Sequence, residues 1–169
     1  FLHFDESCHF GRAAVKKHLE YFRYTDMDFV KIQYELDFPE RTDLDRPEAW
    51  RSMPEYDEEF YEPELDVVRG LVREAGDEAP VLVTLYSPFM CASQSAGAEV
   101  LDNHLGTEPE HVKRGLASIT RSLLRFVEAC IDIGVDGFYA STQGGEGFRF
   151  EDQSIFENYI RPFDLEIWE

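Results

Sequence analysis

Short apolar runs alternate along the chain with longer segments of helical periodicity. In residues 11–28, apolar side chains recur every three or four positions, which predicts an amphipathic helix. Residues 28–35 and 79–86 are rich in β-branched and aromatic side chains and predict strands. The short apolar run at residues 137–140 predicts another strand. We expect residues 1–4 to be the tail of an earlier strand.

Two further helices are expected between these strands. Pro63 fits the first turn of one helix, whose apolar side chains recur at helical spacing until Gly76 ends it. Thr107 is expected to cap the longest helix, with Glu110 completing a capping box. The stretch from residue 36 to 62 is acidic and contains prolines, so we interpret it as a functional loop or a short excursion.

Strand and helix therefore alternate about four times. Strands separated by helices pair in parallel through right-handed crossovers, which fits either an open doubly wound sheet or a TIM-type β/α barrel. A barrel takes about 250 residues. The chain has 169 residues and begins at Phe1 rather than at Met, so we expect a single domain, residues 1–169, forming the first half of a barrel. The remaining strands, or a second copy in a homodimer, would cover its exposed edges.

Polar side chains follow the ends of these strands, where both architectures place their sites. They are Asp5, Glu6, Glu35, Tyr86, Ser87, Ser141, Thr142 and Gln143. Any one of them could be only a helix cap or a turn residue. Because the carboxyl ends of parallel strands converge, the set predicts a site. Glu35 is the strongest candidate, since a partly desolvated carboxylate stabilises a cation or moves a proton; a solvated acid is the alternative.

Charge and cysteine content limit the partners. The chain carries 35 acidic and 16 basic side chains, a formal net charge of −19. Such a field repels phosphate backbones and anionic membranes, so we expect neither nucleic acid nor a membrane as a partner. Cys8, Cys91 and Cys130 are odd in number and scattered, which favours a reducing cytoplasm over a disulfide framework. No apolar stretch approaches membrane-spanning length.

Two apparent motifs carry little chemistry. The glycine-rich run at residues 144–147 resembles a phosphate loop, but it lacks a lysine and puts Glu146 where an anion would bind. His3, Cys8 and His9 match no zinc-binding spacing, so we expect no metal and no other cofactor. The remaining histidines are interpreted as ordinary surface or helix residues: His18, His104 and His111.

Several stretches together resemble the uroporphyrinogen decarboxylase superfamily. They are APVLVTLYSPFMCASQSAG, the long helix ending in EACIDIGVDGFYASTQGG, FENYIRPFDLEI, and the earlier YTDMDFVKIQYE. The resemblance rests on order and spacing over nearly the whole chain. It implies a β/α barrel and an enzyme, either a porphyrinogen decarboxylase (a carboxy-lyase of tetrapyrrole metabolism) or a methyltransferase that uses a corrinoid or thiol partner.

The resemblance also implies roles for single residues. Glu35 stands where the decarboxylases have an aspartate that binds pyrrole N–H groups and stabilises the cation formed on ring protonation, so it is the expected catalytic residue. Gln94 replaces a family tyrosine, and Gln143 lies at or next to a family serine. Asp5 replaces the first of the arginines that pair with substrate carboxylates. The expected substrate-binding residues are His3, Asp5, Arg12, Tyr86, Ser87, Gln94, Thr142 and Gln143.

The departure at Asp5 affects the expected substrate. Binding uroporphyrinogen, which carries many carboxylates, takes several cations at the mouth of the site, and an acidic mouth disfavours it. We therefore expect another small molecule, of the tetrapyrrole or corrinoid type. A methyltransferase would use zinc and a corrinoid, with His and Cys ligands late in the barrel. A catalytically silent binding or assembly module that keeps the fold is the third alternative.

Overall fold

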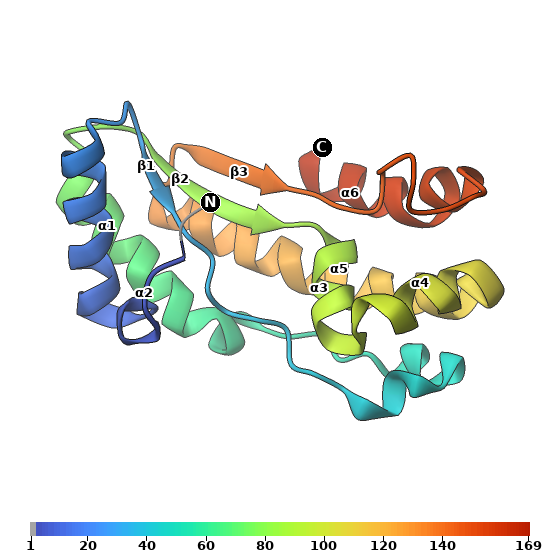
Figure 1. The fold of residues 1–169 in the computed structure, drawn as a ribbon. Coiled ribbons are helices and arrows are strands. Elements are labelled where there is room, and N and C mark those ends of the chain that lie inside the picture. Colours follow the sequence, from blue (N-terminus) through green and yellow to red (C-terminus); the bar gives the residue numbers. More distant parts are fainter. Residues whose placement is uncertain (1–2) are drawn as a thin grey trace. The chain divides into compact units, whose positions relative to one another are not determined.

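The computed structural model describes residues 3–169 and shows an α/β fold with a three-stranded parallel sheet in the order β1-β2-β3 (Figure 1). The strands are β1 (Val30–Ile32), β2 (Val81–Tyr86) and β3 (Gly137–Ser141). In the register of the first pair, Val30 lies opposite Val81 and Ile32 opposite Val83. Helices separate the strands along the chain, as expected for parallel pairing.

The described chain forms two compact units. The first comprises residues 3–36, 57–85 and 125–141, and the second comprises residues 37–56, 86–124 and 142–169. The assignment of residues 1–169 to a single domain stays a prediction.

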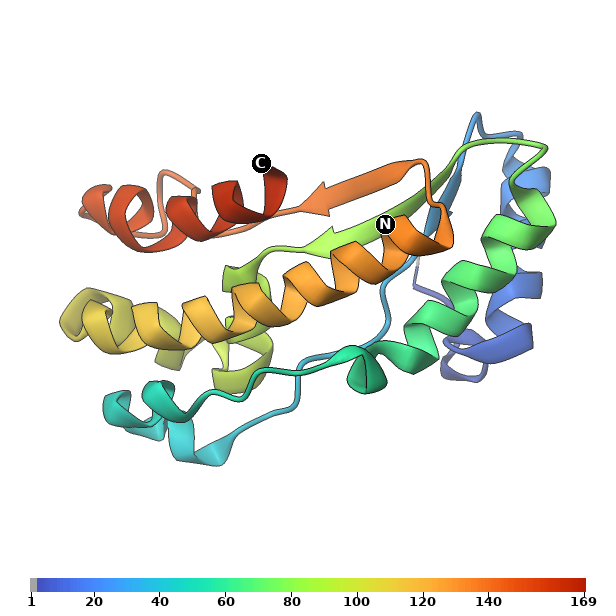
Figure 2. The ribbon, with the colours of Figure 1, turned by 180° about the vertical axis from the view of Figure 1, so that it is seen from behind.

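The first unit holds the sheet, α1 (Gly11–Thr25), α2 (Glu58–Ala75) and the last turns of α5 (Pro109–Ile133). Helices α1 and α2 pack side by side and both contact β1 (Figure 2). Their close approach depends on Gly70, because a Cβ there would lie 2.5 Å from Val15 Cγ2. Val30 and Ile32 are buried on one face of β1. The alternation of side chains along a strand therefore turns Lys31 to the opposite face, where its Nζ lies 4.8 Å from the centre of the Tyr139 ring.

The second unit is helical. It holds short 3-10 helices at Thr42–Asp45 and Pro47–Ser52, then α3 (Pro88–Ala96), α4 (Ala98–Thr107), the first turns of α5, a π-helical turn at Phe156–Ile160 and α6 (Arg161–Trp168). Trp50 is fully buried in this unit, and its indole Nε1 donates to His104 Nδ1 at 3.1 Å. The stretch interpreted as a loop or excursion thus contributes a core residue.

Several expected boundaries are wrong. His3 and Phe4 lie outside any strand, because Asp5 begins a short 3-10 helix (Glu6–Cys8) by accepting the Ser7 N–H; residues 1 and 2 lie outside the described part. Thr107 ends α4 instead of capping α5, and its hydroxyl donates to the Asn103 carbonyl.

Helix α2 begins at Glu58, one turn before the expected start, so Pro63 lies inside it rather than in its first turn. Acidic side chains at Glu58 and Glu59 suit the positive end of the helix dipole. The helix ends at Gly76, as the sequence predicted.

Candidate functional site

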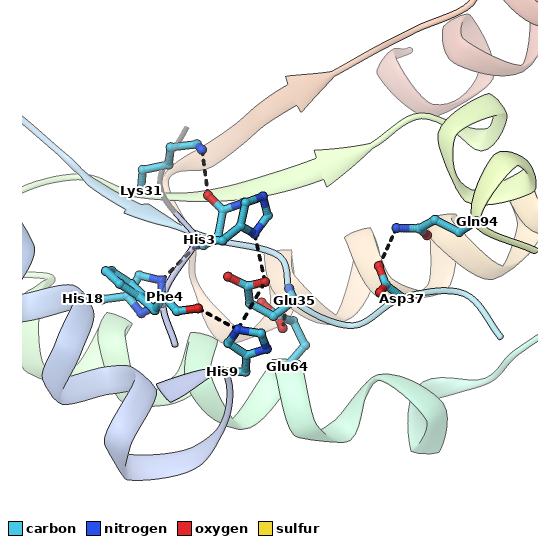
Figure 3. A network of polar contacts seen from close by, with 10 residues as sticks. His3, Phe4, His9, His18, Lys31, Glu35, Asp37, Glu64 and Gln94 are labelled. Carbon is cyan, nitrogen blue, oxygen red and sulfur yellow. Dashed lines mark hydrogen bonds and ion pairs between the residues drawn. The ribbon is translucent and has the colours of Figure 1, made fainter. Parts of the chain in front are cut away.

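Glu35 lies just beyond the carboxyl end of β1, within the first unit. Its side chain is only 6% exposed, and its Oε2 lies 3.0 Å from His3 Nδ1 and 3.8 Å from His9 Nε2 (Figure 3). No helix or turn intervenes between β1 and Glu35, so the carboxylate lies near the edge where a parallel sheet presents its functional groups. Glu35 thus combines a buried negative charge with two adjacent imidazoles.

The partner of His9 determines which of its nitrogens carries a proton. His9 Nε2 lies 2.9 Å from the backbone carbonyl oxygen of Phe4. A carbonyl oxygen only accepts hydrogen bonds, so Nε2 carries the proton and donates it to Phe4. By the same reasoning His3 Nδ1 donates to the Glu35 carboxylate at 3.0 Å. His3 therefore donates a hydrogen bond to the Glu35 carboxylate, while the Nε2 proton of His9 is used by the Phe4 carbonyl.

Glu64 lies beside this group on α2 and is completely buried. Its Oε2 accepts the Glu35 backbone N–H at 3.5 Å. Burial raises the pKa of Glu64 to about 8, and the negative charge of Glu35 acts in the same direction. Burial likewise raises the pKa of the Cys130 thiol to about 12, so this cysteine is a thiol rather than a nucleophilic thiolate.

His18 and His104 lie in α1 and α4, in agreement with their interpretation as helix residues, and both are buried rather than on the surface. His18 Nδ1 donates to the Ala14 carbonyl at 2.8 Å, and its Nε2 accepts the Gln33 N–H at 3.0 Å. Both ring nitrogens are used by the neutral form, and burial lowers the pKa of His18 below its ordinary value. The ring therefore ties α1 to the end of β1.

In the second unit, two predicted residues have structural partners. The Ser87 hydroxyl caps α3 by accepting the Met90 N–H at 3.3 Å. Gln94 Oε1 accepts the Phe38 N–H at 3.1 Å while its Nε2 donates to Asp37 Oδ1 at 2.6 Å (Figure 3). Gln94 thus holds the segment that follows Leu36. Tyr86 is the last residue of β2.

Thr142 and Gln143 line a second feature of the same unit, a pocket of about 400 Å³ between the loop after β3 and α6. The loop itself excludes an anion. Gly144 donates its N–H to Glu146 Oε2 at 2.8 Å, and that oxygen also accepts from Arg149 Nε at 2.8 Å. The chain's own carboxylate therefore uses the Gly144 N–H and the Arg149 guanidinium, two groups that could otherwise bind an anion.

Among the described residues of the first unit, His3 is the predicted substrate-binding residue that contacts Glu35. Asp5 is turned into its own helical turn and accepts from both the N–H and the hydroxyl of Ser7. Arg12 lies on α1 in a groove that also contains Glu74. Neither Asp5 nor Arg12 takes part in the hydrogen bonds that Glu35 forms with His3 and Glu64.

Sequence reasoning missed the parts that His9 and Glu64 play. His9 was considered only as a metal ligand. Glu64 stands three residues after Tyr61 and next to Leu65 on the buried stripe of α2, and an acid at an apolar helical position was the available signal. Across residues 3–169, no group of three or more His, Cys, Asp or Glu side chains could hold a metal ion. The helices of that same range include none with the length and apolarity to span a bilayer.

The chain was compared with known proteins and with models of protein families. The family model described as uroporphyrinogen decarboxylase (URO-D) matches residues 25–152, well over half of the chain. That range includes Glu35, Glu64 and all three strands. No curated protein matches the sequence.

Proposed function

The chain belongs to the uroporphyrinogen decarboxylase family, and we propose that it is an enzyme of the decarboxylase type, a carboxy-lyase, with Glu35 as its catalytic residue. One observation carries the proposal. The Glu35 carboxylate is 6% exposed at the carboxyl end of a parallel strand and lies 3.0 Å from a histidine nitrogen. A carboxylate that is this buried, next to the end of a strand, is not an ordinary solvated acid.

The chemistry follows from this geometry. A pyrrole-type ring that is protonated on carbon becomes cationic, and a nearby carboxylate in a poorly solvated site lowers the energy of that cation. Breaking the bond to the departing carboxyl group then releases CO₂, and the electron pair of that bond neutralises the ring. Glu35 supplies the negative charge, His3 orients it by donating a hydrogen bond at 3.0 Å, and His9 lies 3.8 Å away.

We also propose that the sheet belongs to a β/α barrel. Three parallel strands separated by helices support this architecture. The partly exposed side chains of Lys31 and Tyr139, which contact each other on the sheet, fit an interior that further strands would close.

The proposed substrate carries fewer carboxylates than uroporphyrinogen. The side chains in contact with Glu35 that can carry positive charge are histidines, and Arg12, the arginine expected to bind substrate, lies in a groove of α1. A polyanion would lack the bidentate guanidinium pairs that such ligands use. A tetrapyrrole or related ring with few carboxylates fits better.

Glu35→Gln tests the proposed role. The amide keeps the shape and removes the charge, so we expect turnover to fall about a hundredfold or more while KM changes little. The assay follows CO₂ release from a panel of porphyrinogens with different numbers of carboxylates.

Glu62→Gln is the matched control, because Glu62 lies on exposed surface of α2 in an ion pair with Arg69. Unchanged turnover in Glu35→Gln would remove Glu35 from the mechanism. Ligand binding without any CO₂ release would favour the methyltransferase or the silent binding module over a decarboxylase.

A further inference from the structure

A second carboxyl group lies beside Glu35 in the first unit. Glu64 has no solvent exposure, and its Oε2 accepts the backbone N–H of Glu35 at 3.5 Å (Figure 3). The other oxygen of each carboxyl group, Oε1, is buried and has no hydrogen-bond partner among residues 3–169. Buried oxygens without a donor are costly, and a proton on one of the two groups is the smallest change that supplies one.

We propose that Glu64 holds this proton and is a positioning residue for Glu35, so that the pair carries one negative charge, located on Glu35. The inference rests on the proposed function in one respect, that Glu35 is the catalytic residue that Glu64 positions. Glu64 accepts the Glu35 N–H with one oxygen and holds its proton on the other.

The charges around Glu64 support this assignment. The titratable groups that act on it are Glu35, beyond β1, and Cys130, on α5; each is either neutral or negative. The imidazoles of His3 and His9 contact the Glu35 carboxylate. Glu35 thus accepts a hydrogen bond from His3, while Glu64 is buried without a cation, and two carboxyl groups in such different surroundings take different protonation states.

Ionisation of Glu64 would disturb the pair. Burial raises the pKa of Glu64 to about 8, so the neutral acid is the main form at neutral pH. Above that pH a second negative charge forms next to Glu35 in a poorly solvated place, where like charges repel strongly. The orientation of the Glu35 carboxylate, and any activity that depends on it, should then decline.

Infrared spectroscopy tests the proton directly and needs no substrate. Wild-type protein should show the carbonyl band of a buried, protonated carboxyl group that disappears as the pH passes about 8. Glu64→Gln, which keeps an acceptor oxygen and cannot ionise, should lose the band component that titrates near pH 8, while buried Asp164, whose pKa burial raises to about 7, keeps its own component. Glu62→Gln, on the exposed side of the same helix and paired with Arg69, should keep the component of Glu64.

The pH profile of turnover then tests the positioning role. Glu64→Gln should lose the alkaline decline that wild type and Glu62→Gln show above about pH 8. A wild-type band without a component that titrates near this pH, or such a component that survives in Glu64→Gln, overturns the protonated pair. A lost component with an unchanged profile overturns the positioning role. If no substrate is turned over, the proposed function fails, but the infrared band still determines the protonation of Glu64. If the variant does not fold, the pH titration of the wild-type band alone tests the protonation.

Discussion

At the scale of residues, the interior of the first unit depends on ionisable side chains held neutral. His18 is 3% exposed and bonds Ala14 and Gln33 through its two ring nitrogens. Glu64 is fully buried beside Glu35. Protonating the first or ionising the second places an unpaired charge in a poorly solvated interior, so stability should fall toward both acid and alkaline pH.

His18 determines the acid side of this dependence. Burial lowers the pKa of His18 in the folded protein below its ordinary value of 6.5, so the unfolded chain binds the proton more tightly. The stability that His18 contributes is present above about pH 6.5 and is lost as the pH falls toward its folded pKa. We expect urea unfolding to show this loss. The free energy of unfolding of His18→Gln should be lower than that of wild type by about 1–3 kcal/mol at pH 7 and should depend less on pH below 6.5.

His111→Gln provides the comparison, since His111 lies on α5, in the second unit, outside this hydrogen-bond pair. It should retain the wild-type decline below pH 6.5. An equally steep decline in His18→Gln would assign the acid sensitivity to other groups.

At the scale of elements, glycines decide how closely helices approach their neighbours. Gly70 lets α2 lie against Val15 of α1, and Gly115 lets α5 lie against the ring of Trp50. These two positions belong to different units, and each joins segments far apart in the sequence. Packing therefore requires small residues where helix propensity alone would favour alanine.

Gly115→Ala tests this requirement. In a helix, alanine normally adds up to about 1 kcal/mol of stability relative to glycine. The new methyl group at position 115 would collide with the fully buried Trp50 side chain, so we expect a net loss of about 1–3 kcal/mol. Thermal or urea unfolding measures the difference.

Gly106→Ala is the matched control, because Gly106 lies in α4 with open space around its Cβ position. It should be neutral or stabilising. If both substitutions stabilise the protein, the contact between Gly115 and Trp50 does not limit packing.

At the scale of the whole molecule, membership of the uroporphyrinogen decarboxylase family confirms the resemblance found in the sequence. The net charge of −19 is a property of the entire chain and disfavours anionic ligands at long range. Family and charge therefore point to different substrates, because the substrate in the family's name carries many carboxylates.

We expect weak or absent decarboxylation of uroporphyrinogen. Each missing charge-assisted contact costs about 1.5–3 kcal/mol, so two missing contacts weaken binding by about two to four powers of ten. Any residual rate should increase with salt, since screening reduces the repulsion between the acidic protein and the anionic substrate. Chromatography of the porphyrinogen products measures the reaction. Efficient stepwise decarboxylation at low salt would contradict this prediction.

Local features of the fold could be predicted from the sequence alone. The apolar run at residues 79–86 predicted β2, and Gly76 predicted the end of α2. The apolar run before Glu35 predicted that this residue follows a strand. Such features depend on neighbours along the chain, because periodicity, turn chemistry and strand length are local properties. The same locality explains why the prediction that Thr107 caps α5 is wrong: the residue ends the preceding helix, α4.

Which side chains contact Glu35 depends on the tertiary structure. His3 lies 32 residues before it and Glu64 lies 29 residues after it, and each makes its contact through a different segment. No local pattern encodes such distances, because packing of α2 against β1 brings Glu64 to the strand end. Burial at that meeting point, rather than the identity of the residue, makes Glu64 a neutral acid beside a charged one.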